Sequence, residues 1–70
     1  IQLDATYADA LFNRAIAFDQ KGNRQGAIND FREAANLYKA EGNNEMSATS
    51  TQRAEQVQKS PTSTPSTQSI

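Results

Sequence analysis

The chain contains no cysteine and no histidine, and these two absences remove several classes of function. Without cysteine there is no disulfide framework and no thiolate metal site. Without histidine the chain lacks the commonest general base and metal ligand, and every Ser-His or Cys-His catalytic pair. No segment has the spaced carboxylates and glycine of a calcium loop. We therefore expect no catalytic activity, no metal and no cofactor.

A strong charge of one sign and long apolar runs are also absent. The chain has 7 basic and 8 acidic residues, a net charge of −1, so no long-range field attracts nucleic acid. The apolar stretches are too short to span a bilayer, and no signal peptide is visible. The sequence predicts neither nucleic-acid binding nor membrane insertion, and it does not fix the compartment.

The apolar content is low for a folded domain. Apolar residues make up 36% of the chain, against roughly 45% in globular domains. A chain of this size also buries only about 60% of the surface that it exposes when unfolded. We expect a thin core that neighbouring sequence helps to stabilise.

What is present is helical periodicity up to residue 59. Apolar residues recur at spacings of three and four, which predicts an all-α fold with helices at about 7–21, 24–41 and 43–59. The short loop between the first two helices makes them antiparallel. Residues 60–70 are rich in Ser, Thr and Pro and are expected to be disordered.

Local signals mark the ends of these helices. Thr6 or Asp4 is a candidate N-cap for the first helix. Gly22 suits the left-handed residue after it, and Asn23 is the candidate N-cap of the second helix. Gly42 is expected to end the second helix, and Asn43 or Asn44 to cap the third. The predicted apolar faces comprise Ala8, Leu11, Phe12, Ala15, Ile16 and Phe18; Ala27, Ile28, Phe31, Ala34, Ala35, Leu37 and Tyr38; and Met46, Ser50, Ala54 and Val57.

The spacing of these residues resembles one unit of the tetratricopeptide-repeat family, which repeats about every 34 residues. The matching positions are Leu11, Arg14-Ala15, Phe18, Ala27, Phe31 and Ala34. In that pattern small residues let the two helices approach, and aromatic residues fill the remaining space. The resemblance implies an antiparallel hairpin over 7–41, a fragment of an α-solenoid, with 43–59 as a capping helix.

Other positions refine the resemblance. Residues 1–6 resemble the end of a preceding repeat, so we expect the chain to begin inside a longer array. Arg14 stands where the family usually has Leu, and the alignment pairs it with Asp30 across the hairpin. Lys39 stands where the family usually has Pro, so the second helix is expected to continue to Glu41.

The resemblance also implies where a partner would bind. The family binds ligands mainly in the concave face that the first helix of each unit lines. Asn13 matches an Asn that bonds the backbone of bound peptides in relatives, although it can equally bond a neighbouring helix. A carboxylate clamp is not expected on this helix, because its clamp positions are acidic or apolar. The predicted partner-binding residues are Asp9, Phe12, Asn13, Ile16, Asp19 and Gln20.

Three functions follow as hypotheses. The first is a protein-interaction scaffold that binds a peptide or partner protein on its concave face. The second is a structural C-terminal cap of a repeat array with no ligand of its own. The third is self-association, in which the chain buries exposed repeat faces against another copy.

Overall fold

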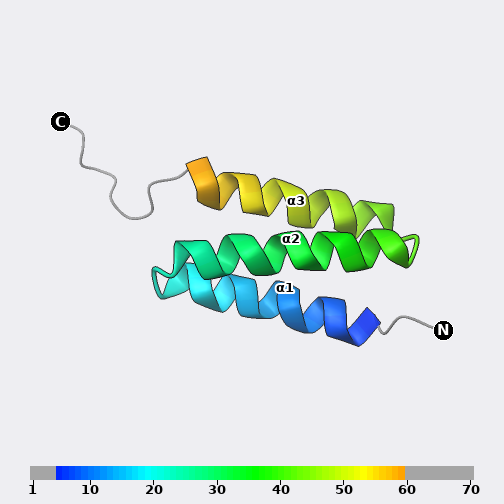
Figure 1. Ribbon diagram of the computed structural model, residues 1–70, viewed down its shortest axis with the longest axis horizontal. Coiled ribbons are helices and arrows are strands. Elements are labelled where there is room, and N and C mark those ends of the chain that lie inside the picture. Colours follow the sequence, from blue (N-terminus) through cyan, green and yellow to red (C-terminus); the bar gives the residue numbers. More distant parts are fainter. Residues whose placement is uncertain (1–4, 60–70) are drawn as a thin grey trace.

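The structure, a computed structural model, describes residues 5–59. They form three helices, α1 (Ala5–Gln20), α2 (Arg24–Ala40) and α3 (Asn44–Lys59). Figure 1 shows α2 lying between α1 and α3, with each helix antiparallel to the next. Within the described residues the fold is all-α, a helix hairpin followed by a third helix, as predicted. The predictions for residues 1–4 and 60–70 lie outside the described part of the chain.

The helix bounds differ slightly from those expected. α1 begins at Ala5, so Thr6 lies inside the helix and its predicted role as N-cap is wrong. The other candidate cap, Asp4, lies outside the described residues. α2 ends at Ala40, one residue before the predicted end, and Glu41 follows as its C-cap.

The two turns share one geometry because both place glycine just after a helix. Gly22 has φ 88° and Gly42 has φ 86°, a left-handed conformation that glycine adopts without steric cost. After α1, the amide of Asn23 donates to the carbonyl of Phe18 at 2.8 Å. The amide of Asn43 donates to the carbonyl of Tyr38 at 2.8 Å after α2. Each turn therefore satisfies carbonyl groups that the helix end leaves open.

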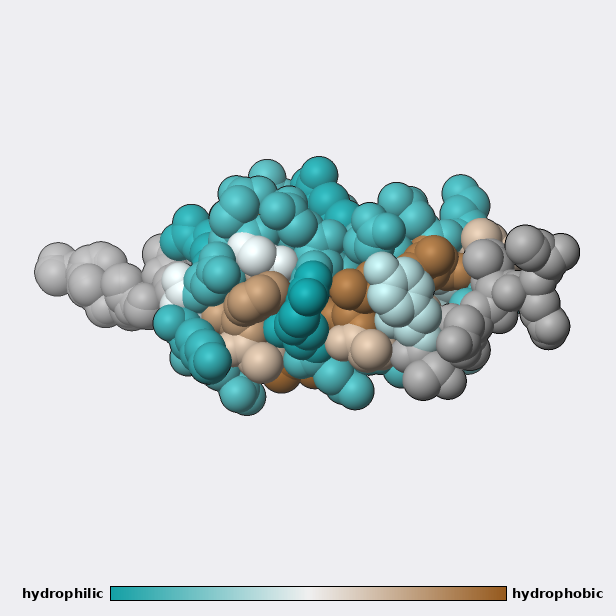
Figure 2. Space-filling view, turned by 60° about the horizontal axis from the view of Figure 1, so that its bottom comes forward, coloured by the Kyte–Doolittle hydropathy of each residue, from teal (hydrophilic) through white to brown (hydrophobic). Residues whose placement is uncertain are grey.

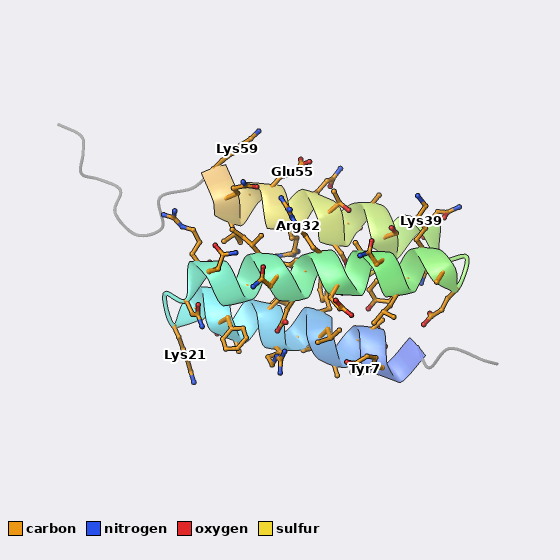
Figure 3. All side chains as sticks on the ribbon, viewed as in Figure 1. Tyr7, Lys21, Arg32, Lys39, Glu55 and Lys59 are labelled. Carbon is orange, nitrogen blue, oxygen red and sulfur yellow. The ribbon has the colours of Figure 1, made fainter. Side chains whose placement is uncertain are left out.

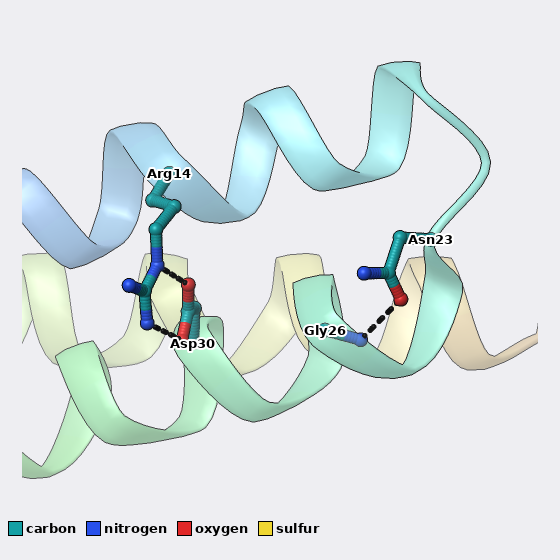
Figure 4. Close-up of polar contacts among 4 residues, drawn as sticks. All are labelled: Arg14, Asn23, Gly26 and Asp30. Atoms are coloured by element: carbon teal, nitrogen blue, oxygen red, sulfur yellow. Dashed lines mark hydrogen bonds and ion pairs between the residues drawn. The ribbon is translucent and has the colours of Figure 1, made fainter.

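Asparagine begins the helix after each turn. The side-chain oxygen of Asn23 accepts a hydrogen bond from the amide of Gly26 at 3.0 Å (Figure 4). Asn43 accepts one from the amide of Met46 at 3.2 Å. These bonds satisfy amides at the starts of α2 and α3, which have no partner within their own helices. The predicted caps Asn23 and Asn43 are confirmed.

The core lies along α2, and it forms two clusters toward the two ends of the molecule. The predicted apolar faces are confirmed, because every residue named for them is buried or half-buried. One cluster contains Ala15, Ala27, Ile28, Phe31, Ala54 and Val57. The other contains Ala8, Leu11, Ala34 and Tyr38. Side chains of all three helices thus contribute to the core, and α2 contributes to both clusters.

Candidate binding groove

An ion pair fixes α1 against α2. Arg14 donates two hydrogen bonds to the carboxylate of Asp30, from Nε to Oδ2 at 2.6 Å and from Nη2 to Oδ1 at 3.0 Å (Figure 4). The side chain of Asp30 is only 9% exposed, whereas that of Arg14 is 59% exposed. The hydrogen bond to Asp30, and then the attraction between the charges, raises the pKa of Arg14 above its usual value. The predicted pairing of these residues is confirmed.

A second polar contact joins the same helices nearer the start of α1. The hydroxyl of Tyr38 donates a hydrogen bond to Oδ1 of Asp9. Tyr38 is buried. Burial raises the pKa of Tyr38 to about 12, and the hydrogen bond to Asp9 and the charges of Asp9 and Glu41 add to the effect. This contact and the ion pair fix the register of α1 on α2.

A groove of about 330 Å³ opens between α1 and α3. Its apolar lining comes from all three helices, namely Ile16 of α1, Phe31 of α2 and Val57 of α3. Polar side chains complete the walls, with Asp19 and Gln20 from α1 and Arg53 and Gln56 from α3. The groove thus combines apolar side chains with a larger share of polar ones, and polar groups can fix the orientation of a ligand.

An aromatic pair, Phe12 and Phe31, lies at the groove. The rings of Phe12 and Phe31 meet edge to face, with centroids 5.3 Å apart and planes at 72°. The guanidinium carbon of Arg53 lies 5.7 Å from the centroid of the Phe12 ring. At this distance the cation is attracted to the face of the ring. Phe12 therefore connects the core to the charged wall of α3.

The structure divides the six predicted binding residues. Three of them, Ile16, Asp19 and Gln20, line the groove together. Phe12 lies beneath Arg53 and packs against the core. The side chain of Asp9 accepts the bond from Tyr38. Asn13 is exposed, and its side chain forms no hydrogen bond with another residue of 5–59.

The α3 side of the groove was not predicted from the sequence. Arg53, Gln56 and Val57 come from α3, which had been considered only as a cap. The periodicity of α3 marks Val57 as buried, but it gives no sign that Arg53 and Gln56 face α1. To predict that Arg53 and Gln56 face α1, the rotation and position of α3 relative to α1 must be known.

A smaller groove of about 270 Å³ lies between α2 and α3. Its lining is polar around two alanines, and it comprises Arg32, Ala35, Asn36, Thr51, Ala54 and Glu55. Arg32 points toward α3, while Glu55 and Lys59 point outward from α3 (Figure 3). Arg32 donates to the side-chain oxygen of Gln58 at 3.2 Å. The lining of this groove contains no large apolar side chain.

The side of the molecule that α1 forms carries apolar surface in two areas, separated by hydrophilic side chains (Figure 2). Tyr7 is the large apolar residue most exposed on α1, at 55%. No helix within residues 5–59 is long and apolar enough to cross a membrane. No group of three or more acidic residues in that range is placed to hold a metal ion.

Comparison of the chain with family models, with curated proteins and with solved structures gives no match. The tetratricopeptide resemblance therefore stays a prediction from the spacing between Leu11 and Ala34.

Proposed function

We propose that this chain is a protein-interaction module of tetratricopeptide type that holds a peptide segment of a partner in the groove between α1 and α3. The observation that carries the proposal is the composition of this groove. Half-buried Ile16 offers apolar contact above the buried Phe31 and Val57, and Gln20 and Gln56 line the walls. Amide side chains both donate and accept hydrogen bonds, so they suit a peptide backbone.

The geometry of the groove supports an extended or helical segment rather than a small molecule. α1 and α3 run in the same direction on either side of α2 (Figure 1), and each contributes residues from about one helical turn to the groove. Its volume of about 330 Å³ lies at the lower end of the range for small-molecule pockets. A peptide that lies along such a groove gains affinity from a few anchoring side chains.

The test uses peptides selected from a display library of random sequences against the full chain. Gln20 is an exposed groove residue, and Thr51 is an exposed residue of the smaller groove. A Gln20→Trp variant places an indole in the binding groove and should weaken selected peptides by about tenfold or more. Thr51→Trp is the matched control and should leave affinity unchanged. Equal affinities for both variants would contradict the proposal.

The alternative of a structural cap also has an observation in its favour. The outward residues of α3 are mostly polar, and they include Glu45, Gln52, Glu55 and Lys59. A terminal element of a repeat array needs such a hydrophilic outer face. The two functions predict different effects of replacing the exposed residues Arg53 and Gln56. Replacing both by Ala should weaken peptide binding if the groove is the site, and should change nothing if α3 is only a cap.

A further inference from the structure

The two walls of the groove carry opposite charges. Asp19 of α1 provides the anion, and Arg53 of α3 provides the cation. The other polar lining residues, Gln20 and Gln56, are neutral amides. A groove with one charge of each sign favours a ligand that also carries both signs.

The side chain of Arg53 is held by an aromatic ring, but no acidic side chain of residues 5–59 neutralises its charge. Its guanidinium lies over the ring of Phe12, yet no carboxylate of residues 5–59 forms an ion pair with it. Arg14 makes the useful contrast, because it also lies over an aromatic ring, that of Phe18, at 5.4 Å. Arg14 is already paired with Asp30, so its charge holds the hairpin together. The donors of Arg53 are left for an acidic group from outside.

Asp19 is the counterpart at the end of α1. No basic side chain of residues 5–59 forms an ion pair with it. It lies in the last turn of α1, where the helix dipole adds negative potential. Both features favour a basic group of a ligand at this position.

The charges are separated along the groove, with apolar surface between them. Phe12, which lies beneath Arg53, precedes Asp19 by seven positions, which is about 10 Å along a helix. Ile16 lies between them on α1, and it faces the same groove as Val57. The order along the groove is therefore cation, apolar surface, anion.

We propose that the groove between α1 and α3 selects a peptide segment in which an apolar side chain, seated on Ile16, lies between an acidic residue facing Arg53 and a basic residue facing Asp19. This inference rests on the proposed function and adds the chemistry of the ligand. Because Phe12, beneath Arg53, and Asp19 are about 10 Å apart along the axis of α1, we expect the acidic and basic residues of a helical ligand to be about seven positions apart.

The experiment repeats the peptide selection on three versions of the full chain: the native sequence, Arg53→Glu and Asp19→Lys. Both residues are exposed, so the substitutions leave the core intact, and circular dichroism checks this. Peptides selected on the native chain should carry an apolar residue flanked by one acidic and one basic residue. Arg53→Glu should select two basic flanks, and Asp19→Lys two acidic flanks. Arg32→Glu, a charge reversal in the smaller groove, is the control and should reproduce the native selection.

Affinities of individual peptides give the quantitative test. Replacing the acidic flank of a native-selected peptide by Lys should weaken binding to the native chain about five- to tenfold. Arg53→Glu should restore most of that loss. Unchanged flanking charges across the three selections, for peptides that still lose affinity with Gln20→Trp, would overturn this inference alone. Selection of no peptide sensitive to Gln20→Trp would overturn the proposed function, and this inference with it.

Discussion

α1 packs on α2 with large and charged side chains, whereas the buried residues that α3 packs on α2 are small or medium-sized. Between α1 and α2, Leu11 and Tyr38 share a cluster, and Arg14 is bonded to Asp30. Between α2 and α3 the buried residues of α3 are Ser50, Ala54 and Val57. Specific pairs fix the first interface in one register, while small residues mainly allow close approach in the second.

This difference has a consequence for the candidate groove. One wall belongs to α1, which is held by an ion pair and a tyrosine hydrogen bond. The other wall belongs to α3, whose bonds to α2 include those of Ser47 with the carbonyl of Ala35 and of Gln58 with Arg32. α3 contributes fewer large apolar side chains to the core than α1 does, and elements that bury less apolar surface open at lower free energy. We expect α1 to be the fixed wall and α3 the wall that adjusts to a ligand.

The largest expected effect comes from truncating one buried side chain in each interface. Leu11 and Val57 are equally buried, each 7% exposed. Leu11→Ala should lower the free energy of unfolding by about 2–5 kcal/mol. Val57→Ala removes two carbons and should cost about 1.5 kcal/mol. Thermal unfolding followed by circular dichroism measures both, and an equal or greater loss for Val57→Ala would contradict the comparison.

Breaking the ion pair should have a smaller effect that depends on which partner is removed. Arg14→Gln leaves the carboxylate of Asp30 buried without its cation. Asp30→Asn leaves Arg14, which remains largely in contact with water. Removing the partner of a buried charge costs more than removing the partner of an exposed one. Arg14→Gln should therefore lower the melting temperature more than Asp30→Asn, and the reverse order would show that Asp30 is well solvated.

The buried tyrosine predicts a loss of stability at alkaline pH. The pKa of Tyr38 is about 12 in the folded chain, against about 10 when unfolded. Between these values the folded state keeps a proton that the unfolded state loses, so its stabilising contribution is full below pH 10 and disappears toward pH 12. The slope is at most about 1.4 kcal/mol per pH unit. Urea unfolding across this range should show the loss.

Tyr38→Phe and Tyr7→Phe form the matched pair for this prediction. Tyr38→Phe should cost about 1 kcal/mol at neutral pH through the lost hydrogen bond to Asp9, and it should remove most of the alkaline loss. Tyr7→Phe alters the exposed tyrosine and should preserve the loss. If the two variants have the same alkaline profile, the environment described for Tyr38 is wrong.

The smallest expected effects are those of replacing two serines of α3, which should change the free energy of unfolding in opposite directions. The hydroxyl of Ser47 donates to the carbonyl of Ala35 at 3.0 Å. The hydroxyl of Ser50 is buried and has no hydrogen-bond partner among residues 5–59. Ser47→Ala should lower the free energy of unfolding by about 1 kcal/mol. Ser50→Ala should raise it by up to about 1 kcal/mol, and a loss on that substitution would mean that the hydroxyl is bonded.

The sequence was sufficient to predict the helices and turns because their signals are local. Gly22 with Asn23, and Gly42 with Asn43, mark the ends of helices by residue chemistry alone. The pairing of Arg14 with Asp30 was predicted from the alignment with the tetratricopeptide pattern. The wrong cap, Thr6, shows the limit of local signals, since Thr is also compatible with the interior of a helix.

The candidate groove could be predicted only in part. Ile16, Asp19 and Gln20 follow from the face of one helix. Arg53 and Gln56 follow from how α3 rotates against α2, which small residues such as Ser50 and Ala54 do not fix from sequence. The sequence therefore does not indicate that Arg53 takes part in a binding site, because this depends on the position of α3 beside α1.

The most direct measurement of the central claim is an NMR titration of the isotope-labelled full chain with a selected peptide. If the groove between α1 and α3 is the site, the largest shift changes will fall on Ile16, Gln20, Gln56 and Val57. The amides of Asn36 and Thr51, in the smaller groove between α2 and α3, will change little. Changes centred on Asn36 and Thr51, or spread evenly over the three helices, would contradict the claim.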